Sequence, residues 1–240
     1  MSSSRRAEIA ANLAAVRERI AVACAAAARD ADEVTLVVVT KYFPASDVRL
    51  LVDLGVADVG ENRHQEAEAK HRECADLRQP GGPVLRWHFV GGLQSNKAAA
   101  VAAYADVVHS VDRAKLVQRL DAGAQDRPGP IDVLLQVSLD PPDRPGRAGA
   151  DPADLPELAA LVEAASRLRL RGLMAVAPLG EDPAAAFARL ADVRRDFVAA
   201  HPAADRLSAG MSGDLEAAIR AGATHVRVGT AVLGSRPSVQ

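Results

Sequence analysis

Aromatic residues, cysteines and net charge are all scarce in this sequence, and each shortage excludes a class of protein. Phe, Trp and Tyr make up only 3% of the 240 residues, too few for a surface that stacks nucleic-acid bases. The net charge of −2 offers no electrostatic basis for binding nucleic acid or a membrane surface. The two cysteines, Cys24 and Cys74, are too few for a disulfide scaffold and have no metal-ligand spacing.

Membrane-spanning and secretory patterns are also missing. No apolar run is long enough to cross a bilayer. The N-terminal Met-Ser-Ser-Ser-Arg-Arg leads into an alanine-rich helix and lacks the apolar core and cleavage pattern of a signal peptide. We therefore expect a cytoplasmic protein that does not associate with membranes or nucleic acid.

Helical and strand patterns alternate along the whole chain, after a first helix expected over Arg5–Arg29. Eight short strands follow, and each after the first is preceded by a helix. This alternation predicts a parallel sheet with right-handed crossovers. An open doubly wound sheet is the alternative, but its dinucleotide-binding version needs G-x-G-x-x-G, which the chain lacks. We predict an α/β fold, a single (β/α)8 TIM barrel with an extra N-terminal helix, formed by residues 1–240 as one domain.

The first predicted strand, Thr35–Lys41, is an apolar and largely β-branched run that ends in a lysine. Strand alternation places Val37, Val39 and Lys41 on one face. A lone lysine at a strand end is usually solvated. The alternative is an amine held over a pocket, where it can form a Schiff base. In a barrel, functional side chains gather where the strands end, so the other strand ends decide between these interpretations.

Two loops, after the seventh and eighth strands, combine glycine with hydroxyl side chains. The first contains Met211 and Ser212 ahead of a helix, and the second contains Gly229 and Thr230. Free backbone N–H groups, a hydroxyl and close approach through glycine are features that bind phosphate, and barrels often hold phosphate at these two loops. One such loop alone would indicate an ordinary cap or turn, whereas the pair predicts a phosphate site.

Arg227 shares a strand face with His225 and Gly229, opposite Val226 and Val228. If that face points into the barrel, the buried guanidinium needs an acceptor. The ring nitrogen of pyridoxal 5′-phosphate (PLP) is such an acceptor, because it requires a protein partner. The alternative is an outward-facing arginine beneath a helix.

Six segments that span nearly the whole chain carry a family resemblance. They are Val39-Thr40-Lys41, Gly60-Glu61-Asn62, the run from His88 to Lys97, Arg171-Gly172-Leu173-Met174, the run from Leu207 to Ile219, and the run from Val226 to Ala231. The chain resembles the pyridoxal phosphate homeostasis protein family, single-barrel relatives of the alanine racemase N-terminal domain.

The resemblance implies PLP as the cofactor and gives each site residue a role. Lys41 is the Schiff-base lysine, and Asn62 lies near the cofactor. The phosphate is held by Ser212, Gly229 and Thr230, with Met211 in the same loop, and Arg227 faces the pyridine nitrogen. No catalytic residue and no metal site are implied.

Two positions depart from the pattern of many relatives. Phe43 stands where they carry a second lysine, two residues after the Schiff-base lysine, and Arg147 stands where they carry a lysine after the fifth strand. Arginine keeps the positive charge but cannot form a Schiff base at neutral pH. Arg147 lies in a long Pro/Gly/Asp/Arg-rich loop over Ser138–Pro152, which we interpret as a lid or a mobile loop.

Other histidines are weaker candidates. His64, Glu68 and His71 have helical spacing, but the charged residues around them favour a solvated helix face over a metal site. We interpret His88 and His109, at strand ends, as hydrogen-bonded core histidines rather than pocket residues.

The function expected from the resemblance is intracellular PLP homeostasis, by a monomer that carries or buffers PLP without appreciable turnover. PLP and PLP-requiring apo-enzymes are the expected partners. Two alternatives remain: a PLP-dependent amino-acid racemase, and a Schiff-base aldolase that uses Lys41 on a sugar phosphate without PLP.

Racemisation needs acid/base groups on both faces of the substrate. The related racemases supply a tyrosine opposite the lysine, held in part by a second domain for which we expect no room before Gln240. Tyr42 directly follows Lys41, so strand alternation predicts that it turns away from the pocket. Tyr104 is expected at the end of a helix.

Overall fold

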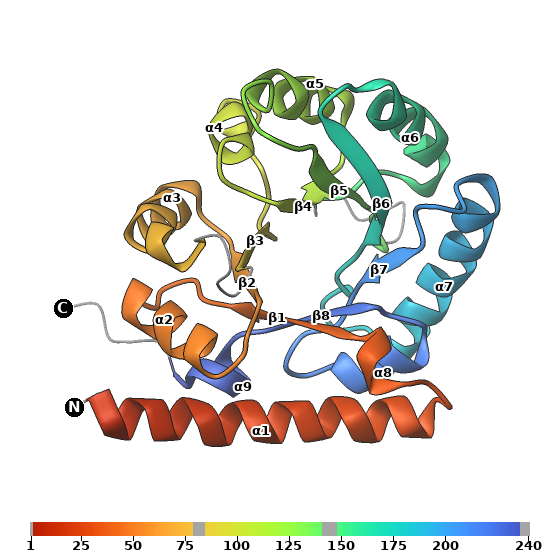
Figure 1. Cartoon of the computed structure of the whole chain (residues 1–240). Coiled ribbons are helices and arrows are strands. Elements are labelled where there is room, and N and C mark those ends of the chain that lie inside the picture. The colour runs from red at the N-terminus through yellow and green to blue at the C-terminus, as the bar shows by residue number, and fades with distance from the viewer. Residues whose placement is uncertain (1, 79–84, 141–147, 236–240) are drawn as a thin grey trace.

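Eight parallel strands close into a barrel in chain order in the computed structural model, which describes residues 2–78, 85–140 and 148–235 (Figure 1). The strands are β1 (Thr35–Val39), β2 (Asp58–Glu61), β3 (Arg86–Phe89), β4 (Val107–Val111), β5 (Ile131–Gln136), β6 (Leu168–Met174), β7 (Arg206–Ser208) and β8 (His225–Val228). Strand β8 returns to pair with β1. The predicted (β/α)8 barrel is therefore confirmed.

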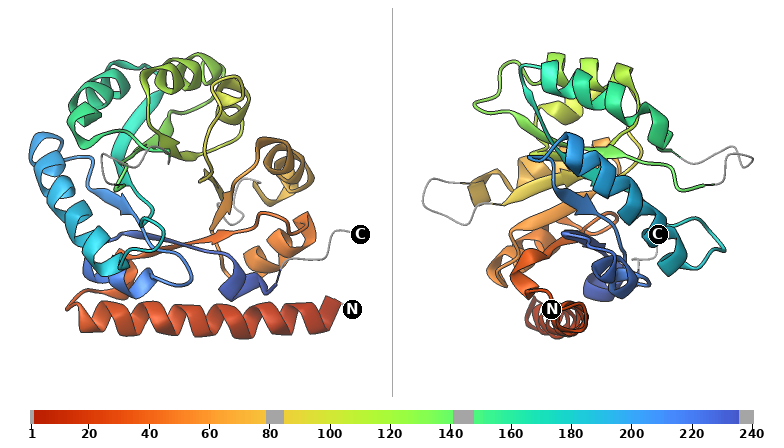
Figure 2. Two further views of the ribbon diagram at one scale, coloured as in Figure 1. Left: turned by 180° about the vertical axis from the view of Figure 1, so that it is seen from behind. Right: turned by 90° about the vertical axis from the view of Figure 1, so that its right-hand side faces the viewer.

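Helices surround this barrel on all sides (Figures 1 and 2). They are α1 (Ser2–Ala26), α2 (Ala45–Asp53), α3 (His64–Glu73), α4 (Ala98–Ala102), α5 (Ala114–Gly123), α6 (Leu155–Ala164), α7 (Pro183–Ala200), α8 (Leu215–Arg220) and α9 (Thr230–Leu233). Short 3-10 turns occupy Ala31–Glu33, Ala75–Arg78 and Pro152–Asp154. Among the described residues, no helix is both long enough and apolar enough to cross a membrane.

The extra N-terminal helix, α1, lies across the outside of the barrel beneath β1, β8, α8 and α9 (Figure 1). Its buried face carries one apolar residue per turn, from Ile9 to Ile20. This face packs in one cluster with Val226 and Val228 of β8. The helix also bonds to α9, because Asn12 Nδ2 donates to the carbonyl of Val232 at 3.1 Å.

The inner side of the barrel wall is unusually polar. Val107, Leu134 and Met174 form a small apolar cluster there. On β8, whose valines face outward, His225 and Arg227 point inward and are each only 5% exposed. Buried polar groups must be hydrogen-bonded to remain there, so these side chains constrain what surrounds them.

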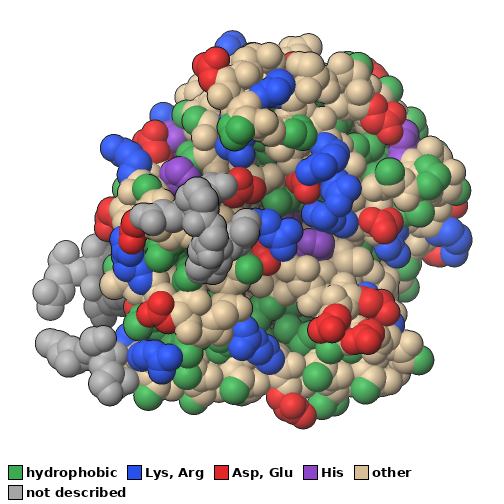
Figure 3. All heavy atoms as spheres, in the orientation of Figure 1, with side chains coloured by type: hydrophobic (Ala, Val, Ile, Leu, Met, Phe, Trp, Pro, Cys, Tyr) green, Lys and Arg blue, Asp and Glu red, His purple; other side chains and the backbone are tan. Residues whose placement is uncertain are grey.

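Ion pairs close the end of the barrel at which the strands begin. The Asp58 carboxylate accepts a hydrogen bond from Arg86 Nε at 2.8 Å. The Asp132 carboxylate is bonded to Arg169 Nε at 2.6 Å and to Arg206 NH1 at 3.2 Å. Figure 3 faces this end and shows Lys and Arg side chains gathered over the middle of the barrel. A pocket lies at the opposite end, where the strands finish.

Two predicted boundaries were wrong by a few residues. The first helix spans Ser2–Ala26 rather than Arg5–Arg29, and β1 ends at Val39 rather than Lys41. The shift of Lys41 out of the strand changes the site.

Candidate functional site

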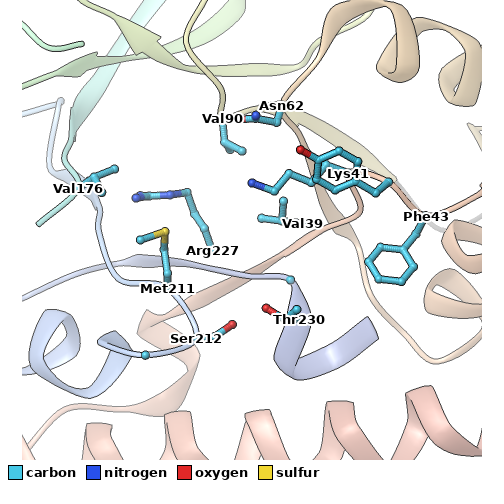
Figure 4. Close-up of a pocket in the computed structure, with 13 residues that line it drawn as sticks. Val39, Lys41, Phe43, Asn62, Val90, Val176, Met211, Ser212, Arg227 and Thr230 are labelled. Carbon is cyan, nitrogen blue, oxygen red and sulfur yellow. The ribbon is translucent and has the colours of Figure 1, made fainter. Parts of the chain in front are cut away.

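One pocket at the end of the barrel where the strands finish contains all seven residues predicted for the site (Figure 4). These are Lys41, Asn62, Met211, Ser212, Arg227, Gly229 and Thr230. The cavity has a volume of about 380 Å³. Its other lining residues, which sequence reasoning missed as pocket residues, are Val39, Tyr42, Phe43, Val90, Val176 and Gly213.

Lys41 is presented by a tight turn and not by a strand end. The backbone N–H of Phe43 donates to the Thr40 carbonyl at 3.0 Å, which closes the turn. Tyr42 adopts φ = 71°, in the left-handed region that non-glycine residues seldom enter.

This turn brings Tyr42 into the wall of the same pocket as Lys41. The expectation that Tyr42 turns away was therefore wrong, because strand alternation holds only for extended backbone.

The turn is fixed from beneath by a buried ammonium group. Lys70 on α3 donates to the Thr40 carbonyl at 2.6 Å and to Oε1 of Glu61 and Oε1 of Glu66, each at 2.7 Å. An ammonium has three N–H donors, so these three acceptors saturate it. Glu66 also accepts the backbone N–H of Tyr42. Lys70 thus joins both ends of the turn that carries Lys41.

Glu61 is the most deeply buried member of this group, at 1% exposed. Burial raises the pKa of the Glu61 carboxyl, and the ammonium of Lys70 opposes that rise. The hydroxyl of Thr40 donates to Oε1 of Glu61 at 2.5 Å. The carboxylate therefore depends on Lys70 for its counter-charge.

The two glycine and hydroxyl loops face one another at one side of the pocket. In Figure 4 the hydroxyls of Ser212 and Thr230 point toward each other from separate loops. A Cβ added at Gly229 would lie 3.1 Å from the Val39 carbonyl, so glycine permits this close packing. Arg19 of α1 donates to the Ser212 carbonyl at 3.0 Å and holds the first loop from outside the barrel.

Arg227 reaches into the pocket from the inner face of β8, which decides between the inward and outward positions that the sequence pattern left open (Figure 4). Its NH1 donates to Ser208 Oγ at 2.7 Å and its NH2 to the Ala175 carbonyl at 3.0 Å. Burial lowers the pKa of the Arg227 guanidinium to about 10, so the group stays charged at neutral pH. A guanidinium has five N–H donors, so donors remain for a ligand.

The other predictions have mixed outcomes. His88 and His109 are buried and bonded to each other at 2.8 Å, which confirms them as core histidines. Phe43 is 5% exposed and packs in the outer core beneath Arg5. Arg147 and part of its loop lie outside the described residues.

Within the described ranges, no group of three or more His, Cys, Asp or Glu side chains is arranged to hold a metal ion. On α3, the ring of His64 stacks on Tyr104, and the ring of His71 meets the ring of Trp87 edge-on. These contacts account for the two histidines that had metal-ligand spacing in the sequence.

The barrel and its pocket define a class of protein. The family described as the alanine racemase N-terminal domain matches residues 7–237. A relative from Pseudomonas aeruginosa, named pyridoxal phosphate homeostasis protein, is 46% identical over 234 residues, which cover 95% of this chain and 96% of the relative. A relative of the same name from Mycobacterium tuberculosis is 44% identical over 245 residues, covering 97% of this chain and 94% of the relative.

A solved structure agrees with these relatives. PipY from Synechococcus elongatus, with PLP bound, has a TM-score of 0.79 and 37% identity, covering 94% of this chain and 100% of PipY. The chain belongs to the pyridoxal phosphate homeostasis protein family.

We predict that Lys70→Met lowers the free energy of unfolding by about 3–5 kcal/mol, because it leaves the carboxylate of Glu61 buried without its partner. Urea unfolding at pH 7, followed by circular dichroism, measures the change. Arg72→Met is the matched control on the same helix, since Arg72 is 72% exposed and pairs with Glu68 at 3.4 Å. The free energy of unfolding of Arg72→Met should fall by less than about 0.5 kcal/mol. Equal losses in the two variants would contradict the role given to Lys70.

Proposed function

We propose that this chain binds PLP in the pocket at the ends of the strands and serves intracellular PLP homeostasis as a carrier or buffer. One observation supports this above the others: a single cavity brings together an amine, a buried guanidinium and two hydroxyl loops. These groups match the aldehyde, the ring nitrogen and the phosphate of PLP. The names of the relatives and the PLP-bound structure of PipY support the same ligand.

The donors in the pocket fit the group. We propose that Ser212, Thr230 and the backbone around Gly229 hold the phosphate, that Arg227 donates to the ring nitrogen, and that Asn62 lies beside the ring. Lys41 would hold PLP covalently, as a Schiff base at Nζ. When bound, PLP supplies an aldehyde for amines and a ring that withdraws electrons.

The same residues argue against appreciable turnover. A guanidinium has no lone pair and stays charged, so Arg227 can only donate to an unprotonated ring nitrogen. An unprotonated pyridine withdraws electrons less well than a protonated one. Both ring nitrogens of His88 and of His109 are used in bonds inside the barrel, so neither residue provides an acid/base group in the pocket.

Amino-acid racemisation is the second candidate, and the position of Tyr42 favours it. Tyr42 lines the pocket beside Lys41, so a second acid/base side chain is present there. The decisive difference between the two functions is proton exchange at Cα of an amino acid.

We predict that borohydride reduction of the PLP-loaded protein fixes one PLP on Lys41, because Lys41 is the lysine that lines the pocket. Intact-mass analysis and peptide mapping measure the adduct. Lys41→Met should lose it, and Lys97→Met, the matched control outside the pocket, should keep it. An adduct chiefly on Lys97 or Lys115 would refute the assignment. A protein that stays colourless with added PLP would favour the aldolase alternative.

We predict that Arg227→Glu changes the absorbance spectrum of bound PLP and its pH dependence, because a carboxylate favours a protonated ring nitrogen. Arg227→Gln is the control that removes the charge without supplying a carboxylate. Circular dichroism should first establish that both variants fold. An unchanged spectrum together with unchanged PLP affinity would mean that Arg227 does not contact the ring.

We predict that the PLP-loaded protein exchanges Cα protons of amino acids with solvent deuterium no faster than free PLP does. NMR over a panel of L-amino acids measures the exchange, with Tyr42→Phe and Lys41→Met in parallel. Exchange with inversion at rates typical of enzymes, about 1 per second or faster, would establish the racemase if both variants abolish it.

A further inference from the structure

An unbroken chain of buried polar side chains runs inside the barrel from the pocket to the opposite end. Arg227 NH1 bonds Ser208 Oγ at 2.7 Å, and Ser208 Oγ bonds His109 Nδ1 at 2.9 Å. His109 Nε2 bonds His88 Nδ1 at 2.8 Å, and His88 Nε2 bonds Asp58 Oδ1 at 2.7 Å. We call these five residues the relay. Every member is at most 6% exposed.

The Asp58 end of the relay determines which atom donates in each hydrogen bond along it. Asp58 also accepts two bonds from Arg86, at 2.8 and 2.9 Å, so its carboxylate is ionised and can only accept. His88 must then carry its proton on Nε2, and a neutral ring leaves Nδ1 as an acceptor. His109 must therefore donate from Nε2, which leaves its Nδ1 as an acceptor in turn.

The Arg227 end favours the same direction independently. The guanidinium can only donate, so Ser208 Oγ accepts from it. The single proton of Ser208 is then free to go to His109 Nδ1. Any reversed arrangement needs an extra proton on a histidine and leaves the buried Ser208 hydroxyl proton without an acceptor in this chain of bonds, which is costly.

The surroundings of His109 favour a neutral ring. The other charged or titratable groups that act on His109 are His88, His225, Arg206 and Arg227. Burial lowers the pKa of His109 well below its usual range and lowers the pKa of His225 to about 3.

On the basis of the proposed PLP site, we propose that Ser208 and His109 are positioning residues for Arg227, and that Asp58 sets the direction of their hydrogen bonds through His88. A one-way relay gives the guanidinium a permanent acceptor at NH1 and prevents its rotation. The N–H groups that remain are then aimed into the pocket before any ligand arrives. The end of the barrel farthest from the pocket thereby determines the geometry at the ring-nitrogen position.

Histidine NMR on the free protein tests the direction without a ligand. Long-range ¹H–¹⁵N spectra of ¹⁵N-histidine protein should show His88 and His109 as Nε2–H tautomers at pH 8, above the ordinary histidine pKa of about 6.5. His109, the pKa of which burial lowers, should stay neutral down to pH 5.5. Either residue as the Nδ1–H tautomer, or as an imidazolium at pH 8, would overturn the relay.

Variants of the hydroxyl test the positioning. Ser208→Ala should raise the dissociation constant for PLP about tenfold, since a hydrogen bond to a charged group is lost. It should also move the ¹⁵N shift of ring-labelled bound PLP toward that of a protonated pyridine. Ser208→Thr, which retains a hydroxyl, should restore both values. Thr224→Val is the matched control, because its hydroxyl bonds Leu207 and His225 outside the relay.

The outcomes separate this inference from the proposed function. If Ser208→Ala behaves like Thr224→Val in both affinity and ¹⁵N shift, the positioning role is wrong although PLP binding stands. If the wild-type protein gives neither an absorbance band nor a borohydride adduct with PLP, the proposed function fails and the positioning role toward PLP fails with it. The tautomer measurement still decides whether the relay exists, because it uses the free protein.

Discussion

The guanidinium of Arg227 is a positive charge in the middle of a barrel, and most of the interior is arranged around it. A charge taken out of water is tolerated only when it is paired or hydrogen-bonded. Here the partners are neutral, a serine hydroxyl and a main-chain carbonyl, so the charge is oriented without being neutralised. An ion pair at this point would have cancelled the positive charge that faces the pocket. Placing the carboxylate of Asp58 at the far end of the histidine chain avoids that cancellation.

The second constraint comes from outside the barrel, through α1. Arg19 of this helix bonds the carbonyl of Ser212 in the first loop proposed to hold phosphate. Asn12 bonds the carbonyl of Val232 in α9, the helix that follows Gly229 of the second loop. Arg19 is itself held by Glu216 of α8 at 2.8 Å. The extra helix is therefore bonded to segments that follow two different strands, β7 and β8. Its apolar face packs against the barrel, and its polar residues Arg19 and Asn12 form the hydrogen bonds to Ser212 and Val232.

The sequence pattern allowed the barrel and the two glycine and hydroxyl loops to be predicted, because each depends on local pattern. Strand alternation correctly places Arg227 on the face of His225 and opposite Val226, since β8 is extended throughout, but only the family resemblance implied that this face points into the barrel. It fails at Tyr42, where a left-handed residue breaks the alternation three positions after β1 ends. The role of Lys70 was missed for a different reason: its acceptors come from the ends of β1 and β2 and from its own helix, and only the closed barrel brings them together. His88 and His109 were placed in the core from sequence, but the direction of their hydrogen bonds depends on distances that no sequence spacing contains.

Holding PLP and using it for catalysis place opposite demands on the ring nitrogen. Catalysis of carbanion chemistry favours a protonated ring, and retention of an unreacted cofactor favours an unprotonated one. A residue that can only donate a hydrogen bond favours the unprotonated ring nitrogen, and it does so most effectively when its side chain cannot rotate away from that nitrogen. The proposed relay holds the Arg227 guanidinium in one orientation, whereas the turn that carries Lys41 is held by the separate ammonium of Lys70. In the proposed carrier, the covalent bond at Lys41 and the electronic state of the ring are thus controlled by two independent buried networks. Weakening one of these two networks should therefore leave the other network intact. An enzyme does not require this separation, because its lysine and its ring nitrogen act in one reaction.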